Sequence, residues 1–380
     1  MADAAAASLT AAQVATRRLQ SLGLAAPSGG DVPELGSAAH VVEHHLAMQA
    51  QDFKASQWAI GSRLDGATRA DVLAAYDSGE IVRSWPMRGT VHVTLARDLP
   101  WMLDLLGERA LRGVERRWQV LDIDAAMLEH ARDVAVDLLR GGRRVTRAQL
   151  QAALSDEGHD FGGPRGYHVV WYLAQTGTLV QGPVGEAGDQ LLVLLDEWIR
   201  DPVRFADRDD AIAELGRRYL QAHAPARVED LMWWSSLGKR ECRAAFEAAS
   251  DEYVPVRRGD DEVWVRRDHV GEPVRSRPTM LALAAFDEHL LGYRVRDEVL
   301  DPAAAHLVDP GRNGVFRYTL VDRGRVIATW RRTPRAKRIV VDVAPFATLA
   351  PARERAAVAA IERWGSFVGS AVEVRFGAPS

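Results

Sequence analysis

The chain has 380 residues, of which 47% are hydrophobic and 26% charged, and its formal net charge is −4. This length exceeds a typical single core and predicts two to four compact units with the composition of an ordinary soluble globular protein. The single cysteine, Cys242, excludes an intramolecular disulfide and fits a reducing compartment. The N-terminus lacks a basic region followed by an apolar run, and no apolar stretch reaches about 18 residues. We therefore expect no signal peptide, no contact with a membrane, and a cytoplasmic protein.

Basic charge is unevenly distributed along the chain. Between Arg257 and Arg338 there are 17 Lys and Arg against 12 Asp and Glu, a balance of +5, whereas the remainder has 31 against 40, a balance of −9. Arginine suits bidentate phosphate contacts, and only three of the 48 basic residues are lysines. A GC-rich genome also produces an Ala- and Arg-rich composition, so the arginine bias alone does not identify a nucleic-acid partner.

A helix followed by two short strands recurs three times. Apolar spacing predicts the helices, and alternation between turn residues predicts the strands. The copies are 71–78 with strands 81–82 and 91–94, 167–176 with strands 178–180 and 190–194, and 241–248 with strands 253–256 and 263–265. Upstream helices are predicted near 38–48, at 146–154 and at 228–237. Two helices and a β-hairpin form the winged-helix plan, and three unrelated helix-hairpin units are the alternative.

The connecting segments and the C-terminal third complete the predicted organisation. Helical connectors are predicted at 99–106, 111–120, 127–139 and 211–222, and the C-terminal third has an apolar run at 280–286, strand-like alternation over 315–343, a helix at 351–364 and a strand at 371–375. We predict an α+β protein with three tandem winged-helix repeats joined by helical segments and a β-rich C-terminal domain. The expected boundaries are 1–98, 99–195, 196–275 and 276–380.

The short segment Gln49-Ala50-Gln51 carries the most informative chemistry. A glutamine amide offers a hydrogen-bond acceptor and a donor but no charge, so a pair of them holds a water molecule without accepting its proton. An active site of this kind needs a substrate with a good leaving group, such as a cationic, alkylated nucleobase. Residues two apart share a face only in extended backbone, so this segment should leave the preceding helix. The alternative is that both glutamines are polar residues that close a helix.

Five segments carry a family resemblance in the same order along the chain. They are Leu9-Thr10 with Gln13-Val14 and Arg17-Arg18-Leu19; Gln49-Ala50-Gln51; Trp85-Pro86-Met87-Arg88-Gly89-Thr90-Val91-His92; Arg218-Tyr219-Leu220 with Trp233-Trp234-Ser235; and Phe286-Asp287-Glu288-His289-Leu290-Leu291-Gly292-Tyr293 with Asn313-Gly314-Val315-Phe316 and Thr329-Trp330-Arg331-Arg332. Together they resemble the bacterial winged-helix DNA glycosylases typified by AlkZ and its relative YcaQ. YcaQ-type members carry Asp in place of the second Gln, so Gln51 places the chain nearer to AlkZ.

The resemblance implies a monofunctional DNA N-glycosylase that acts on N7-alkylguanine, on bulky antibiotic adducts or on crosslinks, in DNA repair or self-resistance. Gln49 and Gln51 are the expected catalytic residues. The expected partner is double-stranded DNA with an alkylated purine, bound by a nucleoid-associated monomer that needs no cofactor and no metal. The candidate DNA-binding residues are Arg88, His92, Arg331, Arg332, Arg335 and Lys337.

Two other functions fit parts of the sequence. A non-catalytic winged-helix regulator or drug-binding resistance protein would bind DNA, usually as a dimer on paired half-sites, but no dimerisation coiled coil is evident. His40-Val41-Val42-Glu43-His44 matches the H-x-x-E-H pattern of a zinc hydrolase, with two histidines one helical turn apart. No third zinc ligand is identifiable from the sequence.

Overall fold

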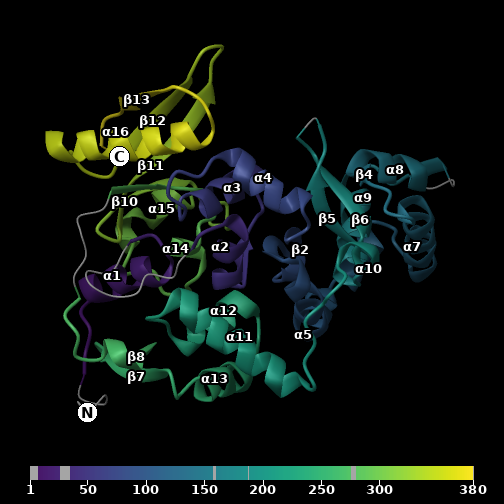
Figure 1. The fold of residues 1–380 in the computed structure, drawn as a ribbon, viewed down its shortest axis with the longest axis horizontal. Coiled ribbons are helices and arrows are strands. Elements are labelled where there is room, and N and C mark those ends of the chain that lie inside the picture. The colour runs from purple at the N-terminus through teal and green to yellow at the C-terminus, as the bar shows by residue number, and fades with distance from the viewer. Residues whose placement is uncertain (1–6, 26–34, 157–159, 187, 275–279, 380) are drawn as a thin grey trace. The chain divides into compact units, whose positions relative to one another are not determined.

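The computed structural model describes residues 7–25, 35–156, 160–186, 188–274 and 280–379. The chain divides into two compact units (Figure 1): unit 1 comprises Met1–Val72 and Ile212–Ser380, and unit 2 comprises Leu73–Ala211. Unit 1 is therefore assembled from both ends of the chain, and unit 2 is a single continuous segment. The predicted division into four parts is finer than this separation and stays a prediction.

Unit 1 combines helices from both ends of the sequence with the C-terminal strands. Its elements are α1 (Ala11–Ser21), α2 (Ala38–His45), β1 (Ala47–Gln49), α3 (Phe53–Gly61), α12 (Val228–Ser235), α13 (Lys239–Ala248), β7 (Tyr253–Arg258), β8 (Asp261–Arg266), β9 (Met280–Leu283), α14 (Glu288–Leu291), α15 (Ala305–Val308), β10 (Tyr318–Asp322), β11 (Arg325–Pro334), β12 (Ile339–Pro345), α16 (Pro351–Phe367) and β13 (Val372–Phe376). Two helices cross the unit boundaries, namely α4 (Arg69–Asp77) and α11 (Arg208–His223).

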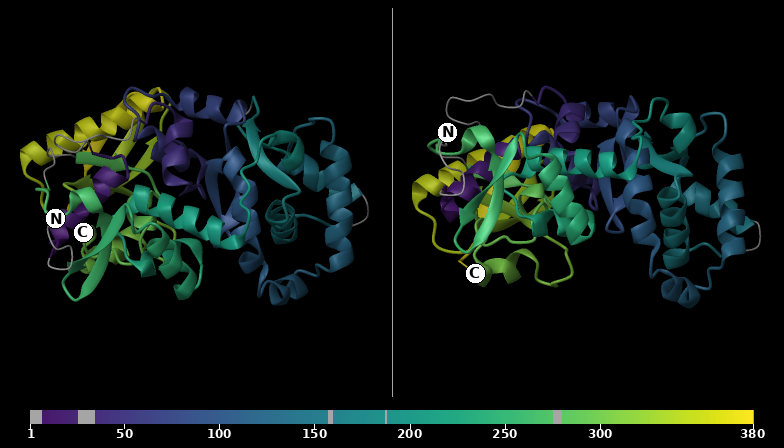
Figure 2. Two further views of the ribbon diagram at one scale, coloured as in Figure 1. Left: turned by 60° about the horizontal axis from the view of Figure 1, so that its bottom comes forward. Right: turned by 90° about the horizontal axis from the view of Figure 1, so that it is seen from below.

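The β-rich C-terminal part of unit 1 is a sheet with strand order β13-β12-β11-β10-β9. Helix α16, yellow in Figure 1 and Figure 2, lies along this sheet, where Trp364 packs against Trp330 with ring centroids 5.2 Å apart. Its end also reaches α3: a Cβ on Gly61 would lie 2.2 Å from the Phe367 ring, so only glycine permits this approach. The predicted strands over 315–343, the last helix and the final strand are confirmed.

Unit 2 holds the first and second predicted hairpins. Its elements are β2 (Ile81–Met87), β3 (Thr90–Leu95), α5 (Leu99–Leu111), α6 (Glu115–Val120), α7 (Ala125–Leu139), β4 (Val145–Thr146), α8 (Arg147–Asp156), α9 (Gly163–Gln175), β5 (Leu179–Val184), β6 (Gln190–Leu194) and α10 (Leu195–Trp198). Within this unit the strand order is β3-β2-β5-β6-β4, joined between the hairpins by the Arg83–Gln181 pair. The two hairpins therefore share one sheet, which their separate local patterns did not indicate.

A common core explains why these two hairpins associate. Val82 of β2, Val180 of β5 and Val193 of β6 are buried in one apolar cluster that also contains Leu99 and Leu103 of α5. Burying these faces together removes apolar surface from water, which is the main favourable term in folding. The third hairpin, β7–β8, forms a separate two-stranded sheet in unit 1 and follows α12 and α13.

At two positions a single backbone conformation ends a predicted helix or delays its start. Helix α2 ends at His45 instead of near Met48, because Leu46 adopts φ 63° and redirects the chain. The connector predicted over 111–120 begins only at Glu115, because Gly113 has φ +79° and separates α5 from α6. Both interruptions depend on single backbone conformations in segments where the apolar spacing continues.

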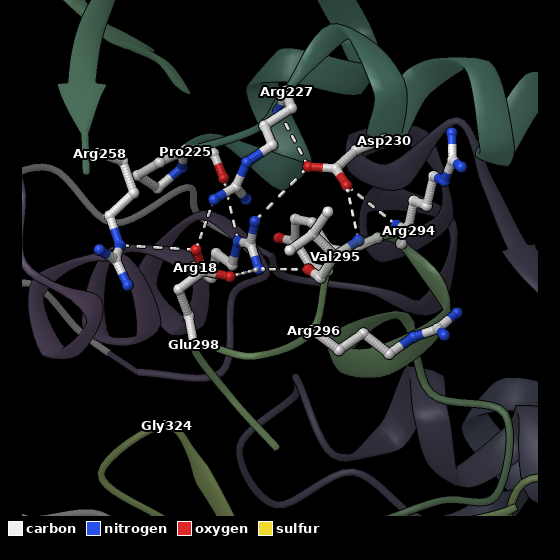
Figure 3. Close-up of polar contacts among 12 residues, drawn as sticks. Arg18, Pro225, Arg227, Asp230, Arg258, Arg294, Val295, Arg296, Glu298 and Gly324 are labelled. Atoms are coloured by element: carbon white, nitrogen blue, oxygen red, sulfur yellow. Dashed lines mark hydrogen bonds and ion pairs between the residues drawn. The ribbon is translucent and has the colours of Figure 1, made fainter. Parts of the chain in front are cut away.

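A buried charge network joins α1 to the C-terminal half of unit 1 (Figure 3). Arg18 lies 3.5 Å from Asp230 and 3.4 Å from Glu298, and its Nε donates to the carbonyl oxygen of Pro225. Arg227 also contacts Glu298, at 2.6 Å. Burying ions is costly unless they are paired and hydrogen-bonded, so these contacts hold sequence-distant segments together.

Within the described residues, none of the helices combines the length and apolar character that crossing a bilayer requires.

Candidate active site

The segment that carries the two glutamines leaves the helix as expected. Leu46 ends α2 with φ 63° and ψ −52°, a conformation that is uncommon outside glycine, and its side chain is fully buried. Gln49 then lies in strand β1 and Gln51 in the bend that follows. The prediction of extended or irregular backbone is confirmed. The Gln49 residue is 6% exposed, whereas Gln51 is exposed at the surface of unit 1.

Asp52 fixes the chain immediately after Gln51. Its Oδ1 accepts hydrogen bonds from the backbone N–H groups of Lys54 at 2.9 Å and Ala55 at 3.0 Å, so Asp52 caps α3. The other carboxylate oxygen lies 3.9 Å from the Arg332 guanidinium. A helix start therefore anchors the C-terminal side of the Gln-Ala-Gln segment.

Glu288 anchors the N-terminal side of the same segment. Its Oε1 accepts the backbone N–H of Gln49 at 2.8 Å, and its Oε2 accepts the indole N–H of Trp234 at 3.2 Å. The Glu288 side chain is fully buried, and His223 Nε2 lies 3.4 Å from Oε2. Glu288 is not among the site residues predicted from the sequence, although it lies inside the Phe286–Tyr293 segment. The sequence signal that could have identified Glu288 is its place between Asp287 and His289 in an otherwise apolar segment, where a glutamate must find hydrogen-bond partners if it is buried.

Asp287 and His289 have structural roles at the start of α14. Asp287 caps this helix through the His289 N–H and forms a bidentate ion pair with Arg63, at 2.9 and 3.0 Å. Burial by itself raises the pKa of the Asp287 carboxyl, but the Arg63 charge and the hydrogen bonds outweigh burial and hold that pKa below its usual value. Asp287 is therefore ionised, and its carboxylate is occupied by the ion pair with Arg63.

Among the predicted basic residues of unit 1, Arg332 faces the residue that follows the glutamine segment. Its guanidinium carbon lies 4.6 Å from the centroid of the Tyr318 ring, and its Nη2 faces Asp52, the neighbour of Gln51. The structure thus brings strand β11 beside the start of α3. Stacking on an aromatic ring orients a guanidinium while leaving its edge available to an anion.

The other predicted basic residues of unit 1 lie on the β11–β12 hairpin. Arg331 pairs with Asp342 at 3.2 Å but remains 81% exposed in its side chain. Arg335 and Lys337 are exposed at the hairpin turn, which the Arg335 N–H closes onto the Arg338 carbonyl oxygen at 2.8 Å. These side chains expose positive charge to solvent at the turn of the β11–β12 hairpin.

Arg88 and His92 belong to unit 2 and contact each other. Arg88 occupies the β2–β3 turn with φ 57°, and its Nη2 lies 3.1 Å from His92 Nε2. His92 Nδ1 lies 2.9 Å from the Thr90 carbonyl oxygen and therefore donates to it, so Nε2 accepts from Arg88. Burial and then the Arg88 charge lower the pKa of His92 well below its usual value. His92 is thus a neutral, fully buried ring that orients the turn arginine.

The H-x-x-E-H segment occupies α2, but His44 is already engaged. Its Nε2 lies 2.6 Å from the Ser21 carbonyl oxygen, and its Nδ1 lies 3.2 Å from the Gln221 amide nitrogen. Among the residues that the structure describes, no three His, Cys, Asp or Glu side chains are grouped so as to hold a metal ion.

The chemistry that this segment offers is that of two uncharged amides. Two carboxylates that the described structure places against it have other roles: Asp52 caps α3 and faces Arg332, and Glu288 accepts backbone and ring N–H groups. Amides orient water and stabilise developing positive charge through their carbonyl oxygens, but they do not accept a proton from water.

Comparison with known proteins identifies the family. Residues 42–367 match the family described as "DNA glycosylase AlkZ-like". A curated protein of Streptomyces sahachiroi, "Interstrand DNA cross-link repair glycosylase", is 24% identical over 348 residues, which cover 88% of this chain and 91% of that protein. The solved structure "Streptomyces sahachiroi DNA glycosylase AlkZ" has a similar mixed α/β fold, with a TM-score of 0.76, 22% identity and coverage of 97% of this chain and 100% of that one. The chain therefore belongs to the AlkZ-like family and is a DNA repair glycosylase.

Proposed function

We propose that this glycosylase hydrolyses the N-glycosidic bond of cationic N7-alkylated purines in double-stranded DNA, with Gln49 and Gln51 as its catalytic residues. The observation that carries the proposal is the Gln-Ala-Gln segment, which is anchored on both sides. Its side chains are amides, whereas hydrolysis with a poorer leaving group would need a general base at this position. Alkylation at N7 makes guanine positively charged, so the departing base is neutral.

The proposed mechanism follows from the amide chemistry. As the bond between C1′ and the base nitrogen breaks, the sugar gains oxocarbenium character, and carbonyl oxygens of Gln49 and Gln51 stabilise that charge. The same oxygens orient a water molecule, which attacks C1′ and loses its proton to solvent. Positioning of water and sugar supplies the remaining acceleration.

Bulky adducts and crosslinks are included in the proposed substrate class. The curated relative's name refers to interstrand crosslink repair, which supports this extension. Exposure of Gln51 also supports it, since an exposed catalytic amide reaches a nucleotide without requiring a deep pocket.

The proposed DNA contacts come from both units. Arg331, Arg332, Arg335 and Lys337 would bind phosphates from unit 1, and the Arg88–His92 pair would bind from unit 2. We further propose three winged helices within the four-part organisation 1–98, 99–195, 196–275 and 276–380. Their last helices and hairpins are α4 with β2–β3, α9 with β5–β6 and α13 with β7–β8. A nucleoid-associated monomer then suffices to hold the duplex.

The decisive test is single-turnover cleavage of a duplex with one N7-methylguanine. Wild type should release the base, revealed as a strand break after alkali, and Gln51→Ala should reduce the rate by at least roughly 100-fold, because it removes an interaction made in the transition state. Duplex affinity should change little. Excision of unmodified guanine at a comparable rate would contradict the leaving-group argument.

Gln119→Ala is the matched control, since Gln119 is an exposed glutamine on α6 in unit 2. It should cleave like wild type. If wild type releases neither N7-methylguanine nor a bulky N7 adduct while still binding the duplex, the proposed substrate class is wrong.

A further inference from the structure

Glu288 is a fully buried carboxylate whose contact with the candidate site is a hydrogen bond to the backbone of Gln49. Glu288 is the first residue of α14. The N-cap of this helix, Asp287, is ion-paired with Arg63, and this pair fixes the backbone position of Glu288. Trp234 comes from α12 and His223 from the end of α11, and both side chains meet Oε2 of Glu288. The remaining oxygen, Oε1, accepts the N–H of Gln49 at 2.8 Å. Side chains from two other helices thus meet one carboxylate of α14, which holds one residue of β1.

The hydrogen-bond pattern requires a proton between Glu288 and His223. His223 Nδ1 lies 3.0 Å from the Tyr219 carbonyl oxygen, which only accepts, so Nδ1 carries a hydrogen. A hydrogen bond across the 3.4 Å between His223 Nε2 and Glu288 Oε2 then needs a second hydrogen, on either the ring or the carboxyl. The pair is electroneutral in both forms, which makes its complete burial tolerable.

We propose that Glu288 is a positioning residue for Gln49: its buried carboxylate, held by Trp234 and His223, fixes the backbone of β1 and thereby directs the Gln49 side chain. This inference rests on the proposed function of Gln49. Strand β1 is only three residues long, so one hydrogen bond to its last residue has a large effect on the position of the strand backbone. At 2.8 Å the bond from the Gln49 N–H to Glu288 Oε1 lies at the short end of the range for N–H···O hydrogen bonds.

The carboxylate cannot be replaced by an amide of equal size. Glu288 accepts on both oxygens, from Gln49 on one side and from Trp234 on the other. A glutamine at this position presents one NH₂ group, which must oppose either the Gln49 N–H or the Trp234 N–H. The expected consequence is a displaced β1 in an otherwise intact unit 1.

The test compares Glu288→Gln with Glu298→Gln, a change at a second buried glutamate that belongs to the Arg18 network. Glu288→Gln should lower the single-turnover excision rate by roughly 10- to 100-fold, because a small misplacement of a catalytic group costs that much. Its affinity for the duplex should stay within about twofold of wild type. Glu298→Gln should lower the melting temperature but leave the excision rate of the folded protein unchanged.

A double-variant cycle separates positioning from general destabilisation. If Glu288 acts through Gln49, most of the Glu288→Gln rate loss should disappear in the Gln49→Ala background, because the group to be directed is then missing. If the Glu288→Gln protein does not fold, Trp234→Phe replaces it as the test variant. It removes one bond to Oε2, and we expect a smaller rate loss with the same dependence on Gln49. Full additivity in the cycle would overturn the inference.

Hydrogen exchange of the segment 47–52 gives a readout independent of activity. Exchange should accelerate in Glu288→Gln and not in Glu298→Gln. If wild type excises no lesion but this exchange pattern is found, the proposed function fails while the positioning of β1 stands. Unchanged exchange together with an unchanged rate in Glu288→Gln would exclude the positioning role.

Discussion

Asp230 shows how much a single buried residue contributes to unit 1. Its Oδ2 accepts the Arg227 N–H at 2.9 Å and lies 3.5 Å from Arg18, and its Oδ1 accepts the N–H groups of Arg294 and Val295 at 2.9 and 3.2 Å. Figure 3 shows these bonds converging from the start of α12 and from the chain that follows α14. The acceptor capacity of a carboxylate matches this set of donors, and that of an amide does not.

We therefore predict that Asp230→Asn lowers the free energy of unfolding by about 2–5 kcal/mol, because its NH₂ must face other donors and Arg18 loses one of its two buried counter-charges, with only Glu298 remaining. Chemical denaturation of both proteins measures the difference. Asp65→Asn is the control, since Asp65 is fully exposed and its oxygen lies 3.5 Å from Arg363. That change should alter stability by less than about 1 kcal/mol. Equal effects of the two changes would contradict the structural role of Asp230.

At the scale of elements, the β11–β12 hairpin places exposed charge where it can bind a phosphate backbone. Its strands are fully paired from Ala328–Pro345 to Pro334–Ile339, so the turn with Arg335 and Lys337 is carried on a regular two-stranded ribbon. A rigid carrier lowers the conformational cost of binding. The local sequence predicted the strand character of this region, because alternation acts over a few positions, but it did not locate the turn between Pro334 and Ile339.

We predict that the double change Arg335→Ala with Lys337→Ala weakens duplex binding equally for lesion-containing and unmodified DNA. The slope of log K against log salt should fall by about two, one for each phosphate that the variant no longer neutralises. Titration of a fluorescent duplex at several salt concentrations measures both effects. Arg353→Ala with Arg355→Ala, on α16, removes the same charge elsewhere in unit 1 and should leave the slope nearer to that of wild type. An unchanged slope in the hairpin variant would remove these residues from the DNA interface.

At the scale of the whole molecule, buried histidines link stability to pH. Burial lowers the pKa of His44 to about 4 and that of His289 to about 4, from an ordinary value of 6.5. Between these values the unfolded chain binds more protons than the folded one, so stability rises with pH in this window. The stabilising contribution is fully present above about pH 6.5 and is lost as the pH falls toward 4. Asp287, whose pKa is depressed in the folded protein, extends the loss to lower pH.

We predict that the free energy of unfolding falls by a few kcal/mol between about pH 7 and pH 4.5, since one pKa unit is worth about 1.4 kcal/mol for each group. Urea unfolding at several pH values measures this slope. His289→Asn removes one of the titrating rings, so its slope should be shallower than that of wild type. Stability that does not change over this range would contradict the burial of neutral histidines.

Local patterns in the chain predicted many of the helices, the three helix-hairpin units, the extended Gln-Ala-Gln segment and the family, because periodicity, turn residues and short motifs are properties of neighbouring residues. They did not predict that Leu46 ends α2 or that the first two hairpins share a sheet. They also missed Glu288, which meets Gln49 across 239 positions of sequence. Contacts of this kind arise only when distant segments fold together, because burial selects which donors and acceptors must be paired.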